Sequence, residues 1–125
     1  MSILVDTSIW ISHFRTVNQG LVDLLKQDAV LIHPMIIGEI ACGTPPSRSA
    51  TLSDLASLRF SQQAHINEVT DFVEREHLYG LGCGIVDMTL LASTLITPNA
   101  KLWTLDKRLS SLAERFDIFY LSNPH

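Results

Sequence analysis

The sequence has few cysteines and no long hydrophobic run, and both absences restrict the class of protein. Its two cysteines, Cys42 and Cys83, form neither a CxxC pair nor a zinc-ligand spacing. We therefore expect two buried free thiols. No segment approaches the roughly 20 apolar residues of a membrane helix, and the N-terminal MSILVDTSIW lacks the basic start of a signal peptide. These absences predict a cytoplasmic protein that does not enter a membrane.

An excess of positive charge is also missing. Nine basic residues face thirteen acidic ones, for a net charge of −4, whereas nucleic-acid-binding proteins usually carry a basic surface. If the four acids discussed below share one site, the other nine acids balance the nine basic residues (13 − 4 = 9). Bound divalent cations would cancel much of the remaining charge, so net charge neither supports nor excludes an RNA substrate.

Several catalytic motifs are absent as well. The sequence contains no phosphate-binding P-loop, no GxSxG nucleophile elbow and no HxxxH or HExxH pair of histidines. A histidine-based metal site is therefore not expected. The lack of a histidine or cysteine nucleophile pattern favours metal-dependent hydrolysis over covalent catalysis.

Short apolar segments alternate with helical patterns along the 125 residues, a length that suits one domain spanning residues 1–125. The alternation predicts an α/β fold with a mainly parallel sheet. The expected strands are Ser2–Val5, Ala29–Ile32, Lys101–Leu105 and Ile118–Leu121. The first expected helix begins at Thr7 and Ser8. The other expected helices are Gln19–Gln27, Pro34–Gly43, Ala50–Leu58, Ala64–Leu78, Ile85–Ile96 and Lys107–Phe116.

Two of the expected strands are followed by an aspartate, Asp6 after ILV and Asp106 after LWTL. All strands of a parallel sheet point their carboxyl ends to one edge, where ligands bind. The two carboxylates are therefore expected side by side. Alternatively, each aspartate simply caps the helix that follows it.

Two further acids lie in apolar helices without a nearby cation. Glu39 has Met35, Ile36, Cys42 and Gly43 three and four positions away, and Asp87 lies within GIVDMTLLAS. A carboxylate in such a setting is costly unless water, a hydrogen bond or a cation satisfies it. The alternatives are a solvent-facing Glu39 and an Asp87 that occupies the first helical turn.

If the four acids converge, their mutual repulsion raises their pKa values unless a cation intervenes. Mg²⁺ or Mn²⁺ suits such oxygen ligands, whereas zinc prefers nitrogen and sulfur. One or two such ions would activate water and stabilise charge on a phosphate, which is the chemistry of phosphodiester hydrolysis.

Four ordered segments, LVDTSIWISHFR, HPMIIGEIACG, GIVDMTLLAS and LWTLDKRL, together resemble the PIN-domain nucleases and closely resemble VapC-type toxins. The resemblance implies a three-layer sandwich with a four- to five-stranded, mainly parallel sheet. It implies a metal-dependent endoribonuclease that is the toxin of a type II toxin–antitoxin system, with Asp6, Glu39, Asp87 and Asp106 holding Mg²⁺ or Mn²⁺. It further implies an RNA substrate, a cognate antitoxin and a homodimer.

The same resemblance assigns supporting roles to two hydroxyls. Ser8 and Thr104 match family positions and are expected to orient metal ligands or water; otherwise Ser8 caps a helix and Thr104 is an ordinary strand residue. Trp10 and Trp103 are expected in the core. Basic residues that could guide RNA phosphates are Arg15, Arg48, Lys107 and Arg108, with Arg48 placed in the loop TPPSRS.

Two other functions remain open from the residues alone. A metal-dependent phosphatase of the haloacid dehalogenase type needs a second aspartate two residues after the first, where this chain has Ser8. A non-catalytic module whose acidic pocket binds basic peptides is the other alternative. The RNA target and the number of metal ions are not specified by the sequence.

Overall fold

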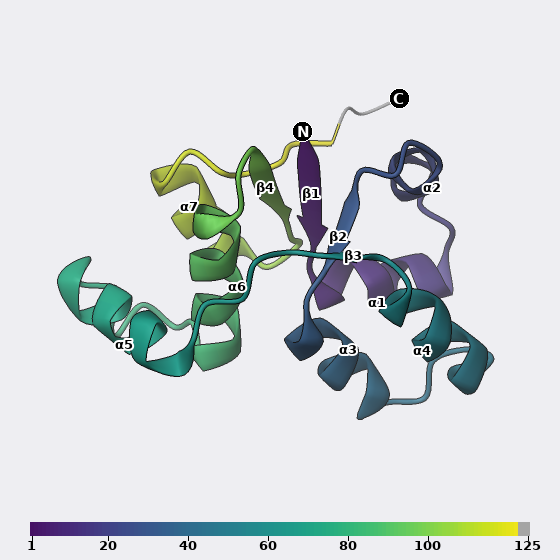
Figure 1. Ribbon diagram of the computed structural model, residues 1–125, viewed down its shortest axis with the longest axis horizontal. Coiled ribbons are helices and arrows are strands. Elements are labelled where there is room, and N and C mark those ends of the chain that lie inside the picture. The colour runs from purple at the N-terminus through teal and green to yellow at the C-terminus, as the bar shows by residue number, and fades with distance from the viewer. Residues whose placement is uncertain (123–125) are drawn as a thin grey trace.

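A four-stranded parallel sheet forms the centre of the computed structural model, which describes residues 1–122 (Figure 1). The strands are β1 (Ser2–Val5), β2 (Val30–Ile32), β3 (Arg59–Phe60) and β4 (Ala100–Trp103), in the order β3-β2-β1-β4. Each neighbouring pair is parallel. This arrangement confirms the predicted α/β class, at the lower end of the expected strand number.

Helices lie on both sides of the sheet. Figure 1 shows α5, α6 and α7 to the left of the strands, α1, α2 and α4 to the right and α3 below them, so helices flank the sheet as in the expected three layers. Their bounds are α1 (Thr7–Arg15), α2 (Gln19–Lys26), α3 (Pro34–Ala41), α4 (Arg48–Ala56), α5 (Ile66–Arg75), α6 (Ile85–Ile96) and α7 (Lys107–Arg115).

The central strand β1 creates the position for a site. The chain leaves β1 toward β2 on one side and returns much later to β4 on the other. In open parallel sheets, a crevice forms at the carboxyl ends of two strands whose connections run in opposite directions. The residues that follow β1 and β4 therefore share one crevice.

The core explains why the strands read as continuous apolar runs. Ile3, Leu4 and Val5 are fully buried, as are the residues of β2, because helices cover both faces of the sheet. Trp10 and Trp103 are 4% and 5% exposed, which confirms their predicted place in the core.

Two strand predictions need correction. Strand β3 was not predicted, because its two residues are both exposed and lack the continuous apolar pattern of a buried strand. The expected strand Ile118–Leu121 is absent as a strand. Only Phe119 forms an isolated parallel bridge, with Leu102, so the chain touches the edge of β4 without continuing along it.

The thiol prediction was half right. Both cysteines are free, but Cys42 is exposed and Cys83 is only half-buried. Cys42 follows the last turn of α3, at the surface rather than in the core, because the buried stripe of that helix is formed by Ile36 and Ile40.

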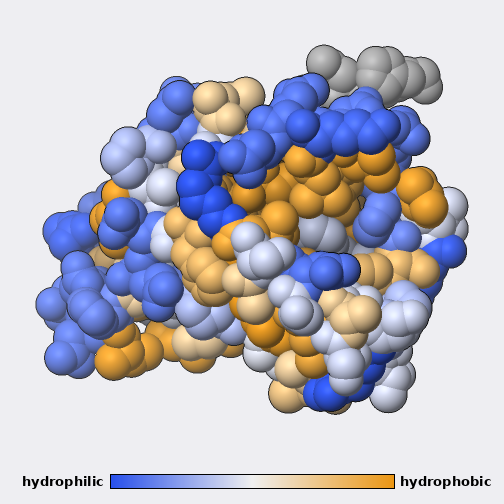
Figure 2. All heavy atoms as spheres, turned by 45° about the vertical axis from the view of Figure 1, so that its right-hand side comes forward, coloured by the Kyte–Doolittle hydropathy of each residue, from blue (hydrophilic) through white to orange (hydrophobic). Residues whose placement is uncertain are grey.

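No helix within residues 1–122 is long and apolar enough to cross a bilayer. On the face shown in Figure 2, hydrophobic side chains gather in the middle and hydrophilic side chains border them.

Candidate active site

Asp6 is held rigidly at the junction of β1 and β4. Its backbone N–H donates to the carbonyl of Trp103 at 2.9 Å. Its Oδ2 accepts hydrogen bonds from the hydroxyls of Ser8 at 2.7 Å and Thr104 at 2.8 Å. Its capping bond from the Ser8 N–H is long, at 3.4 Å, so Asp6 caps α1 weakly while its carboxylate is fixed by hydroxyls.

The second oxygen of Asp6 is left free by this arrangement. Asp6 is 6% exposed, and its Oδ1 accepts no hydrogen bond within residues 1–122. The Nε1 atom of Trp10 is the one buried side-chain nitrogen or oxygen without a partner in that part of the chain. Since Oδ1 of Asp6 has no partner there and is not one of the buried unpaired atoms, it is reachable from solvent. It is therefore the Asp6 atom that is available to a ligand.

Asp106 lies beside Asp6 through the same hydroxyl network. Its N–H donates to Thr104 Oγ1 at 3.0 Å, and the Leu105 N–H donates to Ser8 Oγ at 3.0 Å. One oxygen of Asp106, Oδ1, accepts from the Leu109 N–H at 2.9 Å and caps α7. The capping alternative is thus correct for this residue, but it uses one carboxylate oxygen and leaves the other exposed at the crevice.

Glu39 reaches the same edge from α3. It is exposed, and its Oε1 accepts a hydrogen bond from Thr7 Oγ1 at 2.6 Å. Thr7 begins α1 directly after Asp6, so this bond ties Glu39 to the end of β1.

A buried histidine holds the start of α3 against α6. His33 is 3% exposed, and its Nδ1 accepts from the Met35 N–H at 3.0 Å. The proton of this neutral ring is then on Nε2, which donates to Ser93 Oγ at 3.2 Å. Burial lowers the pKa of His33 and favours this neutral form. The two helices linked here are those that carry Glu39 and Asp87.

The pKa of Asp87 is affected by the charges of all three other acids. Burial raises the pKa of its carboxyl, and so do the nearby charges of Asp6, Asp106 and Glu39, to about 6 in total. A backbone hydrogen bond at Gly84 acts in the opposite direction. No lysine or arginine within residues 1–122 forms an ion pair with any of the four acids.

The carboxylates do not form a closed metal cage by themselves. Within residues 1–122, no group of three or more histidine, cysteine, aspartate or glutamate side chains is arranged to hold a metal ion. Mg²⁺ usually binds one or two carboxylates and completes its shell with water and substrate phosphate. Asp6, which has one oxygen without a hydrogen bond, and Asp87, whose pKa is raised by the charge of Asp6, are the carboxylates that could serve such an ion.

The four predicted basic residues are all exposed, but they differ in what holds them. Arg48 is the first residue of α4, not part of a loop, and it donates to the carbonyls of Ala41 at 2.6 Å and Gly43 at 3.4 Å. Its guanidinium is thus engaged at the end of α3. Lys107 and Arg108 begin α7.

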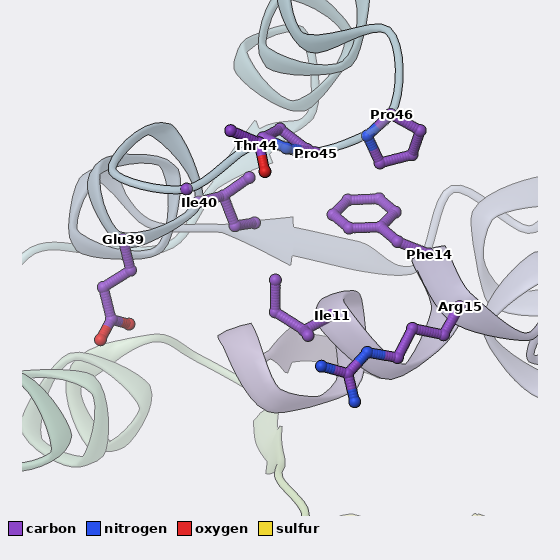
Figure 3. Close-up of a pocket in the computed structure, with 9 residues that line it drawn as sticks. Ile11, Phe14, Arg15, Glu39, Ile40, Thr44, Pro45 and Pro46 are labelled. Atoms are coloured by element: carbon purple, nitrogen blue, oxygen red, sulfur yellow. The ribbon is translucent and has the colours of Figure 1, made fainter.

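Arg15 lines a cavity that also contains Glu39. The cavity has a volume of about 320 Å³ and lies between α1, α3 and the segment that carries Pro45 and Pro46. Figure 3 shows Glu39 and Arg15 on opposite sides of it, with Ile11, Phe14 and Ile40 among the residues between them. The cavity thus has Glu39 on one side, apolar side chains along its middle and Arg15 on the other side.

Two residues that position the site, Thr7 and His33, were not predicted from the sequence. Thr7 was noted only as a helix-starting residue, although its hydroxyl precedes that of Ser8 and both follow Asp6. His33 was given no specific role. Its position one residue before Pro34 was the available signal, because the residue before a helix's first proline is the capping position.

A comparison with protein-family models finds no match. A comparison with curated proteins finds Ribonuclease VapC32 of Mycobacterium tuberculosis, in strains CDC 1551 / Oshkosh and ATCC 25618 / H37Rv. Each is 44% identical to this chain over 110 residues, which cover 87% of this chain and 88% of the relative.

Proposed function

The chain belongs to the VapC family of ribonucleases, and we propose that it is a metal-dependent endoribonuclease that acts as the toxin of a type II toxin–antitoxin pair. The observation that carries this proposal is Asp87, whose pKa is raised to about 6 by burial and by the charges of three other acids, while no cation of residues 1–122 pairs with any of the four. Such stored repulsion is typical of a site built for a ligand.

We propose Mg²⁺ or Mn²⁺ as that ligand, held by Asp6, Asp87, Asp106 and Glu39 directly or through water. When bound, the ion would supply an activated water and would stabilise charge on the phosphate. The oxygen donors favour these hard ions over zinc.

The protein's own contribution is positioning. Ser8 and Thr104 fix one oxygen of Asp6, so the other oxygen has a defined direction. Thr7 does the same for Glu39. Because these side chains are oriented before substrate arrives, little reorganisation is needed during the reaction.

Asp87 is the residue whose ionisation limits activity at acidic pH. Its carboxyl has a pKa of about 6, so it is mostly protonated below that pH and cannot then bind a cation or accept a proton. The kcat/KM of cleavage reports ionisations of the free enzyme, and it is expected to rise as the pH increases through about 6.

The other two hypotheses lack a supporting contact. For a haloacid dehalogenase-type phosphatase, the position two after Asp6 needs an acid, but Ser8 holds that position and its hydroxyl is bonded to Asp6. For a pure binding module, the hydroxyl network that fixes Asp6 would have no purpose. RNA, a cognate antitoxin and a second copy of the chain are the partners we propose from family membership.

The proposal is tested by cleavage of total bacterial RNA by the purified chain and by Glu39→Gln. Glu114→Gln is the matched control, because Glu114 is exposed on α7 and its side chain makes no hydrogen bond within residues 1–122. We expect cleavage by wild type and the control and a loss of at least about 100-fold in Glu39→Gln. Equal activity of Glu39→Gln and wild type would remove Glu39 from the site, and turnover of a small phosphomonoester without RNA cleavage would favour the phosphatase.

A further inference from the structure

The side chain of Arg108 packs against a glycine turn that leads into α6. A Cβ atom added to Gly82 would lie 2.7 Å from a guanidinium nitrogen of Arg108 and 2.8 Å from its Cδ. Real Cβ atoms essentially never approach so closely, so a methyl group at position 82 would displace the Arg108 side chain. Gly82 also has a φ of +87°, which other residues rarely adopt. We call this close contact between the Arg108 side chain and Gly82 the seat of Arg108.

This seat lies at the rim of the carboxylate site. Cys83, the residue after Gly82, has a raised pKa because of burial and the charges of Asp87 and Asp106, whereas the charge of Arg108 acts to lower it. The charges of Arg108, Asp87 and Asp106 therefore all affect the pKa of this one half-buried thiol. Arg108 must lie near both without pairing with either, since no ion pair joins them.

The guanidinium of Arg108 is also free to bind. It makes no hydrogen bond to the rest of residues 1–122, whereas Arg48, Arg59 and Arg115 each donate to a backbone carbonyl. An arginine carries five N–H donors in a planar fork that matches the oxygens of a phosphate. An exposed and unpaired guanidinium that lies two residues after Asp106 and rests against Gly82 therefore suits an anionic group of the same ligand that enters the acidic site.

We propose that Arg108, seated by Gly82, binds a phosphodiester group of the RNA next to the one that is cut. This inference rests on the proposed function, in which the carboxylate site receives the scissile phosphate. Arg108 does not act on the reacting atoms; it fixes the register of the strand across the site. Its contact forms in the bound substrate and persists in the transition state.

Arg108→Gln and Gly82→Ala test this in two independent ways, with an RNA fragment that contains a site cut in total bacterial RNA. Removing the guanidinium is expected to raise KM about 10- to 100-fold with little change in kcat, because an interaction present in both states contributes to binding alone. Arg108→Lys should recover part of the loss, since the charge remains and the fork does not. Gly82→Ala keeps the charge but displaces it, and is expected to raise KM in the same direction.

Gly80→Ala is the matched control for the turn. Gly80 has a φ of +72°, similar to that of Gly82, but a Cβ there would meet nothing within 4 Å. Its backbone strain is therefore comparable and its KM should stay near that of wild type. An unchanged KM in Arg108→Gln, or equal KM values in Gly82→Ala and Gly80→Ala, would overturn the inference while leaving the nuclease intact. Absence of any cleavage by wild type would instead remove the proposed function, and this inference with it.

Discussion

Replacing Asp87 with asparagine should stabilise the protein at neutral pH even though it abolishes cleavage. The carboxyl pKa of Asp87 rises from 3.8 to about 6, because burial and three neighbouring acids oppose its charge. Each pKa unit corresponds to about 1.4 kcal/mol, so the unscreened cost of that charge is about 3 kcal/mol. Asp87 is only half-buried, and solvent screening reduces the expected gain to about 1–2 kcal/mol.

The pH dependence of this gain follows from proton binding. Between pH 3.8 and about 6 the folded protein holds the Asp87 proton more tightly than the unfolded chain. The stability that Asp87 contributes in its protonated form is therefore complete below about pH 4 and is lost as the pH rises through 6. The gain in the free energy of unfolding of Asp87→Asn over wild type should be absent near pH 4 and should reach its full value above pH 7.

Urea unfolding and thermal melting in EDTA at pH 4 and pH 7.5 measure this difference, with Asp71→Asn on the exposed surface of α5 as the control. At pH 7.5 the melting temperature of Asp87→Asn should exceed that of wild type by about 4–8 °C. Added Mn²⁺ should reduce this difference in melting temperature, because the ion stabilises wild type more than it stabilises Asp87→Asn. A variant less stable than wild type at pH 7.5, or an equal difference at both pH values, would refute the electrostatic argument.

Three further substitutions probe other contacts. Thr104→Val keeps the side-chain shape but removes the hydroxyl on Asp6, and should lower the RNA cleavage rate about 10- to 100-fold in a timed assay; a wild-type rate would exclude the orienting role. His33→Asn retains an acceptor for capping α3 but loses the bond to Ser93, and should cost about 1–2 kcal/mol in urea unfolding, against a larger loss for His33→Ala. Trp10→Phe should cost about 1–2 kcal/mol, because the smaller ring leaves a cavity in the core while the buried Nε1 atom has no hydrogen bond within residues 1–122 to lose; a loss above about 3 kcal/mol would reveal a hydrogen bond of Nε1.

The parallel sheet and its acidic edge were predictable because their signals are local. Continuous apolar runs mark strands buried on both faces, and Ser2–Val5 was predicted to the residue. An aspartate directly after such a strand lies at the carboxyl edge wherever the strand sits in the sheet. Glu39 and Asp87 were predicted for a different reason: each is an acid on an apolar helix without a nearby cation.

Other features depend on contacts between distant segments and left no local signal. The strand Arg59–Phe60 is exposed and becomes a strand only by pairing with Val30–Ile32. The bond from Thr7 to Glu39 joins residues 32 positions apart. The contact of Arg108 with Gly82 depends on how α7 packs beside the turn before α6, and the sequence indicated only that Arg108, like three other basic residues, could guide RNA phosphates.

The central claim is that the four acids hold a divalent ion that RNA cleavage requires. The most direct measurement strips the purified protein with EDTA, removes the chelator and follows RNA cleavage as Mn²⁺ is titrated back, for wild type and for Asp87→Asn. The account predicts no cleavage without metal, recovery that saturates with Mn²⁺ in wild type, and no recovery in the folded variant. Cleavage that persists in EDTA, or an Asp87→Asn variant that regains the wild-type rate, would contradict it.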